Sequence, residues 1–166
     1  MTFLKKPHLL LLSSSILLAL IGCQPKVTTA TIDFQFSETD SITMESEEFM
    51  LQKVSSAFII FDDSGRTGNG MFLSKKNYEE LRDELNAGEL PENLSKVEDG
   101  EIDGREYVIY SNVFDDLTEY NCIGWIKDTE YAYLISTDNI DTVRAINSNV
   151  RFVCTILEST GDAQER

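Results

Sequence analysis

The sequence predicts an α+β fold, in which an antiparallel sheet of about six to eight strands packs with two helices. Several short segments alternate apolar with polar residues, which is the period-2 pattern of a strand with one buried face. Two other segments carry apolar residues at helical spacing and follow a side chain that can cap a helix. Gly, Asp, Asn and Ser cluster between these segments, as they do in turns.

The first alternating segment begins near residue 31. Ile32, Phe34 and Phe36 share one face of this expected strand. Residues 37–48 are polar and acidic, so we expect a loop there, followed by a second short strand that begins at Phe49.

A hairpin is expected next. Residues 57–61 are a continuous apolar run, typical of a central strand covered on both faces. Residues 62–65 and 68–70 supply Asp, Ser, Asn and Gly for a turn, and residues 71–73 return as the partner strand. The spacing of the glycines predicts a loose hairpin tip.

The first helix is expected between two residues that favour helix ends. Asn77 can cap its N-terminus, with Glu80 as the capping-box partner three residues later. Gly88 can adopt the left-handed conformation that ends a helix. Three residues form the apolar stripe of this helix: Tyr78, Leu81 and Leu85.

The second half of the chain is rich in strand signals. Residues 89–103 are acidic and are expected to form a loop with one short strand. Residues 107–110 are β-branched and aromatic, which favours a strand. Residues 120–127 and 130–136 are expected to form a hairpin around a two-residue Asp-Thr turn.

A second helix and a last strand complete the prediction. Asp138 is expected to cap the helix. The apolar side of the helix holds Ile140, Val143 and Ile146. The apolar face of the last strand holds Val150, Phe152, Cys154 and Ile156.

The N-terminal segment has the features of a signal peptide. Lys5 and Lys6 form a positive start, and residues 9–22 are apolar apart from three serines. This stretch has 14 residues. A helix needs about 20 residues to cross a bilayer core, so the stretch is interpreted as the apolar part of a signal peptide and not as a permanent span.

Leu20, Ile21 and Gly22 directly precede Cys23, and this run resembles the lipobox of bacterial lipoproteins. The resemblance implies that the Cys23 thiol receives a diacylglycerol, that the chain is cut before Cys23, and that the new amino group is acylated, for example with palmitate. The alternative is an ordinary secretory signal that ends in a cysteine by chance. Two or three acyl chains give a stable membrane anchor, whereas one gives only marginal binding.

The expected organisation therefore has four parts. Residues 1–22 are the signal peptide and residues 23–30 the lipidated cysteine with a short tether. Residues 31–158 form a single α+β domain, and residues 159–166 form a flexible tail. The 144 residues that remain after removal of residues 1–22 suit one domain with a substantial core.

The mature chain is strongly acidic and contains no histidine. Removing residues 1–22 takes away Lys5, Lys6 and His8 but no acid, so 12 basic and 29 acidic residues remain and the formal net charge becomes −17. Such a surface repels phosphate backbones, which argues against nucleic acid as a partner. Without histidine, a Ser-His-Asp or Cys-His site cannot form within the chain.

The motifs of common enzymes and metal sites are missing as well. The sequence contains no G-x-S-x-G, H-E-x-x-H, C-x-x-C or glycine-rich phosphate loop. We therefore expect no catalytic residues, no cofactor and no metal, although an enzyme built on a pair of carboxylates stays open.

Cys122 and Cys154 remain once Cys23 is assigned to the anchor. Disulfides persist in exported proteins, so one interpretation is a structural disulfide between these two cysteines. The other is a pair of separate buried thiols, because free cysteine often serves as a small core residue.

Four segments of the domain carry a resemblance to a known family: residues 104–107, 124–128, 131–134 and 146–152. Their spacing resembles that of small secreted or lipid-anchored bacterial domains of the PsbP-like α+β type. In that family a G-x-x-x-Y strand precedes a hairpin with an aromatic residue on each arm, and a short helix leads to a terminal S-x-x-F. The resemblance spans about residues 31–157 and implies the fold far more than the function. The extra strand expected at residues 151–157 departs from the family pattern.

Three groups of residues are candidates for a site. The first is an aromatic surface for a ligand or partner, formed by Tyr107, Tyr110, Tyr120, Trp125, Tyr131 and Tyr133. The second is the set of acidic clusters near residues 45–48, 98–103 and 115–119, which lack EF-hand spacing. The third is the glycine-containing segment 65–70 with Arg66. Each also has a structural interpretation, namely cross-strand aromatic pairs, a solvated acidic surface and a plain turn.

The expected function is a non-enzymatic binding or assembly module of the cell envelope, anchored outside the cytoplasm to the cell membrane or outer membrane by lipid on Cys23. Its expected partner is another envelope protein. The alternative is a lipoprotein that binds a small molecule or glycan on a tyrosine-lined surface. The weakest option is a hydrolase that depends on paired carboxylates.

Overall fold

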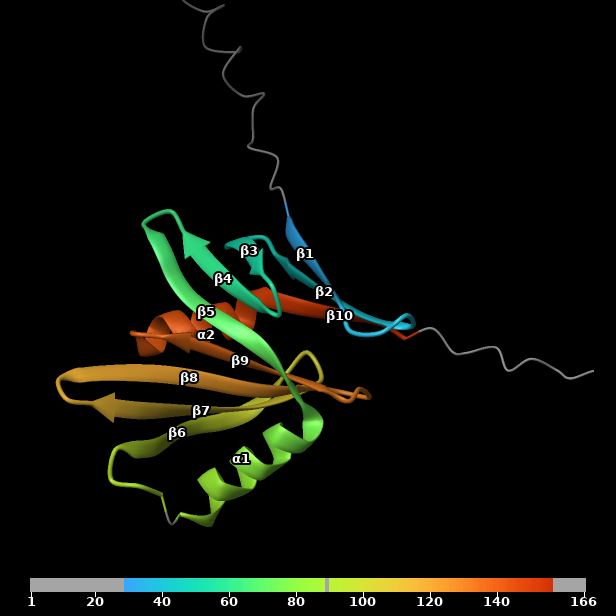
Figure 1. Cartoon of the computed structure of the whole chain (residues 1–166). Coiled ribbons are helices and arrows are strands. Elements are labelled where there is room, and N and C mark those ends of the chain that lie inside the picture. Colours follow the sequence, from blue (N-terminus) through green and yellow to red (C-terminus); the bar gives the residue numbers. More distant parts are fainter. Residues whose placement is uncertain (1–28, 89, 157–166) are drawn as a thin grey trace, which may run out of the picture.

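The structure, a computed structural model, describes residues 29–88 and 90–156 (Figure 1). Within these residues the chain forms ten strands and two helices, which confirms the α+β class. In chain order they are β1 (Ala30–Gln35), β2 (Asp40–Ser46), β3 (Met50–Val54), β4 (Ala57–Asp62), β5 (Gly65–Ser74), α1 (Lys75–Ala87), β6 (Leu94–Ile102), β7 (Arg105–Phe114), β8 (Leu117–Ile126), β9 (Tyr131–Thr137), α2 (Ile140–Asn149) and β10 (Val150–Ile156). The expected signal peptide at residues 1–22, Cys23 and the expected tail at residues 159–166 lie outside the described residues.

The strands form two antiparallel sheets where the sequence predicted one. The larger sheet has seven strands in the order β3-β4-β5-β9-β8-β7-β6, and the smaller has three in the order β1-β2-β10. The ten strands exceed the six to eight that were predicted for a single sheet. The smaller sheet joins strands from both ends of the domain, which local sequence patterns do not reveal.

Strand β2 lies at the centre of the smaller sheet, so the loop expected at residues 37–48 is wrong. Its Ile42 pairs with Phe34 of β1 on one side and with Cys154 of β10 on the other. Ile42 and Met44 are buried, while the Ser, Thr and Glu residues between and around them dilute the apolar signal. The alternation was present in the sequence, but the polar composition concealed it.

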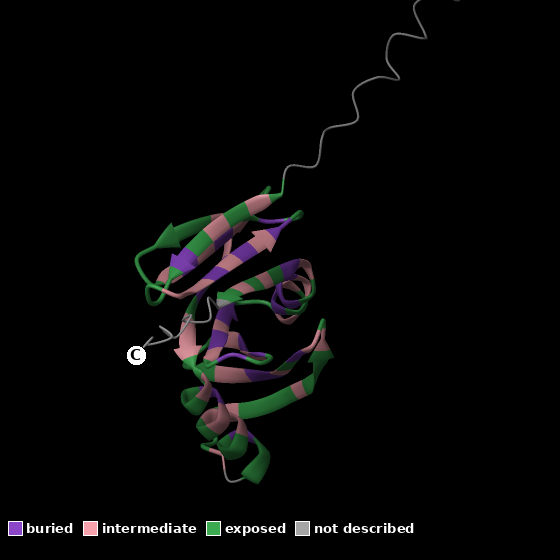
Figure 2. Ribbon diagram, turned by 90° about the vertical axis from the view of Figure 1, so that its right-hand side faces the viewer, coloured by how far each residue is buried: buried purple, intermediate pink, exposed green. Residues whose placement is uncertain are grey.

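Two hydrophobic cores lie on opposite faces of the larger sheet. The first core is shared with the smaller sheet and α2, and it contains Phe34, Met44, Phe58, Ile135 and Ile146. The second lies beneath α1, which covers the other face of the sheet (Figure 1). Figure 2 shows the buried positions alternating with exposed ones along the strands, as expected for strands with one face in a core.

The N-cap of helix α1 lies three residues earlier than the expected cap, Asn77. Ser74 is the N-cap residue, and its side chain accepts a hydrogen bond from the backbone N–H of Asn77. Tyr78 and Leu85 face the second core, as the stripe predicted. Gly88 ends the helix at φ 77°, a left-handed conformation that glycine adopts without a steric penalty, which confirms the predicted C-terminus.

Helix α2 is capped one residue later than expected. The Asn139 side chain accepts hydrogen bonds from the N–H groups of Asp141 at 2.8 Å and Thr142 at 3.2 Å, so Asp138 is not the cap. Val150 follows the helix directly as the first residue of β10. The strand expected after the second helix is therefore confirmed, up to Ile156.

Two expected loops are regular strand. The tip of the β4–β5 hairpin is a tight turn, in which Asp62 Oδ1 accepts hydrogen bonds from the N–H groups of Ser64 and Gly65. Residues 65–70 belong to β5, so the loose tip predicted there is wrong. In the acidic segment 89–103, strand β6 is longer than expected and pairs with β7 along its length.

In the described part of the chain, neither helix is long and apolar enough to cross a membrane.

Candidate functional site

The six aromatic residues proposed as one surface are divided between the two cores. Four belong to the first core or pack against it: Tyr107, Tyr120, Tyr131 and Tyr133. Tyr110 and Trp125 belong to the second core or pack against it, on the opposite face of the sheet. Tyr110 and Tyr133 are buried. The structure thus brings these aromatic residues together as packing groups and does not form one exposed platform from them.

Hydrogen bonds of the aromatic residues stabilise the fold. Trp125 Nε1 donates to the carbonyl oxygen of Thr129 at 2.9 Å and so closes the β8–β9 turn. The Tyr131 hydroxyl lies 3.1 Å from Asp40 Oδ2 and connects the two sheets. Burial raises the pKa of Tyr110 to about 12 and that of Tyr133 well above its ordinary value, so both phenols stay neutral.

A fork in the larger sheet is the most distinctive surface feature. The central strand β9 ends at Thr137, while its two neighbours continue past that point. Gly65, Arg66 and Gly68 of β5 pair only with β4 there, with Thr67 in a β-bulge, and residues 117–119 of β8 pair only with β7. The β4–β5 and β7–β8 hairpins therefore project as two arms on the left of Figure 1.

The start of α2 explains why β9 ends at this point. The Thr137 hydroxyl donates to the carbonyl oxygen of Asn139 at 2.8 Å, which turns the chain out of the sheet. Asn139 then caps α2 through its side chain. These two residues remove the chain from the central position while both neighbouring strands continue, so the backbone edges of the arms face the gap.

A cleft with a volume of about 390 Å³ lies in the fork, between the two arms. It is lined by residues 66–69 of β5, Phe114, residues 117–119 of β8 and residues 136–138 at the end of β9. Leu117 is 75% exposed and Phe114 is 53% exposed, and both lie at the tip of the β7–β8 arm. Large apolar side chains with this exposure beside a cleft are typical of a binding surface.

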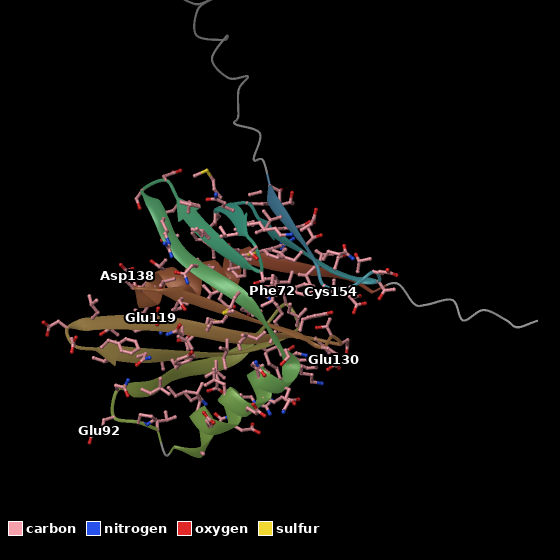
Figure 3. The ribbon with its side chains drawn as sticks, in the orientation of Figure 1. Phe72, Glu92, Glu119, Glu130, Asp138 and Cys154 are labelled. Carbon is pink, nitrogen blue, oxygen red and sulfur yellow. The ribbon has the colours of Figure 1, made fainter. Side chains whose placement is uncertain are left out.

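Charged and polar groups border the cleft on both arms. Arg66 Nη2 donates to Asn69 Oδ1 at 2.8 Å on the β5 side. Glu119 and Asp138 lie at the same end of the molecule, as Figure 3 shows. The cleft therefore combines an apolar rim, charges of both signs and two strand edges that have no neighbouring strand among the described residues. Such edges can accept an additional extended segment through main-chain hydrogen bonds. Of the candidates from sequence, the segment 65–70 with Arg66 lies here, and so does Glu119 of the acidic cluster near residues 115–119.

The acidic clusters are dispersed along the surface. Glu98 accepts hydrogen bonds from Arg144, with a shortest distance of 2.6 Å, and Asp99 lies 2.8 Å from Lys96. Residues 45–48 line a separate small cavity with Arg151. Among the residues that the structure describes, no three His, Cys, Asp or Glu side chains are grouped so that they could hold a metal ion.

Cys122 and Cys154 are both free cysteines, so of the two interpretations the structure has two separate thiols and no disulfide between them. Cys122 is buried in β8 of the larger sheet, and Cys154 is half-buried in β10 of the smaller sheet. Both lie in or against the first core, where a small apolar side chain is suitable. Burial raises the pKa of Cys122 to about 12, which keeps its thiol protonated.

No known family model matches the chain, and no curated protein matches it either.

Proposed function

We propose that this chain is a membrane-anchored extracytoplasmic lipoprotein that binds an extended segment of another envelope protein in the cleft at the fork. The anchor in this proposal is lipid on Cys23, and it rests on the resemblance of residues 20–23 to a lipobox. The observation that supports binding is the early end of β9 between two longer strands. The role is non-enzymatic and needs no cofactor.

The partner segment takes the position that β9 would occupy if it continued beyond Thr137. Its backbone pairs with residues 65–68 of β5 and residues 117–119 of β8. A side chain of the segment packs against Phe114 and Leu117, because these residues otherwise leave apolar surface in water. An extended segment suits a gap between two strands better than a helix does, since only an extended backbone can satisfy both edges.

Site-specific photo-crosslinking in intact membranes tests this proposal. A crosslinker placed at residue 117 of the full-length lipoprotein should trap a partner protein, and the same crosslinker at Met50 should not. Met50 is the matched control, because it is 60% exposed and apolar but lies on the edge strand β3. The variant Leu117→Asp should abolish partner capture by the affinity-purified lipoprotein, and Met50→Asp should leave it unchanged.

Hydrogen exchange gives the structural readout. Partner binding should protect those backbone amides of residues 65–68 and 117–119 whose N–H groups point into the cleft, because no strand pairs with these residues on that side. A crosslink to a second copy of the chain would assign the cleft to self-association. Protection confined to other elements would show that the partner binds elsewhere.

A further inference from the structure

A second large cavity lies at the opposite end of the larger sheet from the fork. Its volume is about 500 Å³. Strand β8 begins at the fork with Leu117 and ends with Ile126 in the wall of this cavity. Strand β10 supplies another wall, including Cys154, which Figure 3 shows on the side away from Glu119 and Asp138. The two cavities are therefore separate sites.

Positive charge is concentrated at this second cavity. Arg105, Lys127 and Arg151 line it together with one acid, Asp103. The whole chain carries a formal net charge of −15 with only 14 basic residues, so three of them in one cavity is a notable concentration. A concave surface lined by one sign of charge attracts ligands of the opposite sign.

These three cations also differ from most other basic residues of the described segments in forming no ion pair. In the described segments, Lys75, Lys76, Arg82, Lys96 and Arg144 each form an ion pair. No ion pair joins Arg105, Lys127 or Arg151 to another described residue. This holds even for Arg151, although Glu45 is its direct neighbour across β2 and β10.

Arg105 differs from Lys127 and Arg151, because its side chain is buried. It is only 4% exposed, and its guanidinium lies 5.3 Å from the ring centre of Phe152 and 5.7 Å from that of Tyr133. Nη2 donates to the carbonyl oxygen of Asn147 at 3.0 Å, whereas Nη1 has no hydrogen-bond partner among the described residues. A buried cation without a counter-charge costs free energy unless a further group compensates it.

We propose that this cavity binds a small organic anion, whose carboxylate or phosphate group is held by Lys127 and Arg151 over the buried charge of Arg105. The apolar part of the ligand packs against Ile126 and Phe152 in the same cavity. The volume lies in the range of about 300–1,000 Å³ that is common for small-molecule sites. Charge-assisted hydrogen bonds from Lys and Arg are the usual means of holding such groups.

The half-buried Cys154 thiol contributes only apolar surface to the wall. Burial raises the pKa of this thiol, so it stays protonated near neutral pH and is a poor nucleophile. The site therefore binds its ligand without covalent chemistry.

Calorimetric titration of the full-length lipidated protein in detergent tests the proposal, with protein-free micelles as the blank. Benzoate and phenyl phosphate are the two anions, and benzamide is the neutral control of the same shape. At least one anion should bind saturably, benzamide should not, and the stronger anion identifies the head group that the site prefers. Saturable binding of neither anion at millimolar concentration, or equal binding of benzamide, would overturn the proposal.

Variants at exposed positions keep the test independent of folding. Lys127→Gln combined with Arg151→Gln should weaken anion binding by about tenfold or more, because it removes two charge-assisted contacts. Lys76→Gln on α1 removes an exposed charge that does not line the cavity and should leave binding unchanged. Equal anion affinity in the double variant and in Lys76→Gln would place the binding elsewhere. Leu117→Asp in the cleft at the fork should not affect anion binding. The anion site and the proposed partner site are therefore tested independently.

Discussion

The hydroxyl of Tyr133 donates a hydrogen bond of 2.7 Å to Asn147 Oδ1, and this contact joins the central strand β9 to the last turn of α2. Both residues are buried. The backbone carbonyl of the same Asn147 accepts the hydrogen bond from Arg105. The ring of Tyr133 also stacks on Phe152 of β10, with 4.5 Å between the ring centres. One tyrosine thus connects both sheets and α2.

Tyr133→Phe should destabilise the protein by about 1–3 kcal/mol, because Asn147 Oδ1 would then remain buried without its donor. Urea unfolding monitored by circular dichroism measures this change. Tyr120→Phe is the matched control, since Tyr120 is half-buried against the same core and its hydroxyl makes no hydrogen bond to another described residue. Equal costs for the two variants would contradict the assigned role of the Tyr133–Asn147 bond.

Gly124→Ala should also destabilise the fold, since a Cβ atom at this position of β8 would overlap the ring of Tyr133. Overpacking of this kind costs about 1–3 kcal/mol. The cost should shrink when Tyr133 is first replaced by Leu, which leaves room for the methyl group. A double-mutant cycle in urea measures the coupling, and additive costs would show that Gly124 is needed for a reason other than Tyr133.

The N-cap of α2 distinguishes the structure from the sequence prediction. Asn139→Ala should lower the free energy of unfolding by about 1 kcal/mol, because it removes the acceptor of two N–H groups in the first turn of α2. Asp138 is exposed, so Asp138→Ala should lower the free energy of unfolding much less. Thermal unfolding of the two variants decides between the residues, and a larger loss with Asp138→Ala would restore the cap predicted from the sequence.

Stability should fall on the alkaline side of the pH range. Burial raises the pKa of Cys122 from 9.0 to about 12 and that of Tyr110 from 10.0 to about 12. Between those values the unfolded chain loses these protons while the folded chain keeps them, so rising pH favours unfolding. Urea midpoints measured from pH 8 to pH 11 should decrease above about pH 9. Cys122→Ala should flatten the first part of that decrease, and an unchanged slope would contradict the assignment.

Cys23→Ser should leave the precursor uncut or move the protein out of the detergent phase, because it removes the thiol expected to carry the lipid. Metabolic labelling with palmitate, together with detergent partitioning, measures both effects. Cys154→Ser is the control, because its thiol lies within the folded domain. Normal processing and labelling of Cys23→Ser would refute the lipoprotein assignment.

The sequence by itself determined the features that depend on neighbouring residues. The alternation of Val150, Phe152 and Cys154 predicted β10, because each strand residue reverses the direction of its side chain. Gly88 predicted the end of α1, because the left-handed conformation there suits glycine. Both signals are local, and so both agree with the structure.

Only the tertiary structure decided which segments meet. The smaller sheet unites β1 and β2 with β10, more than 100 residues further along the chain, and no local pattern specifies that pairing. The fork depends on where β9 ends relative to β5 and β8, which is a matter of register between distant strands. The burial of Arg105 results from the packing of Phe152 and Tyr133 around it. Burial and pairing depend on contacts between residues far apart in sequence, and these contacts exist only once the chain has folded.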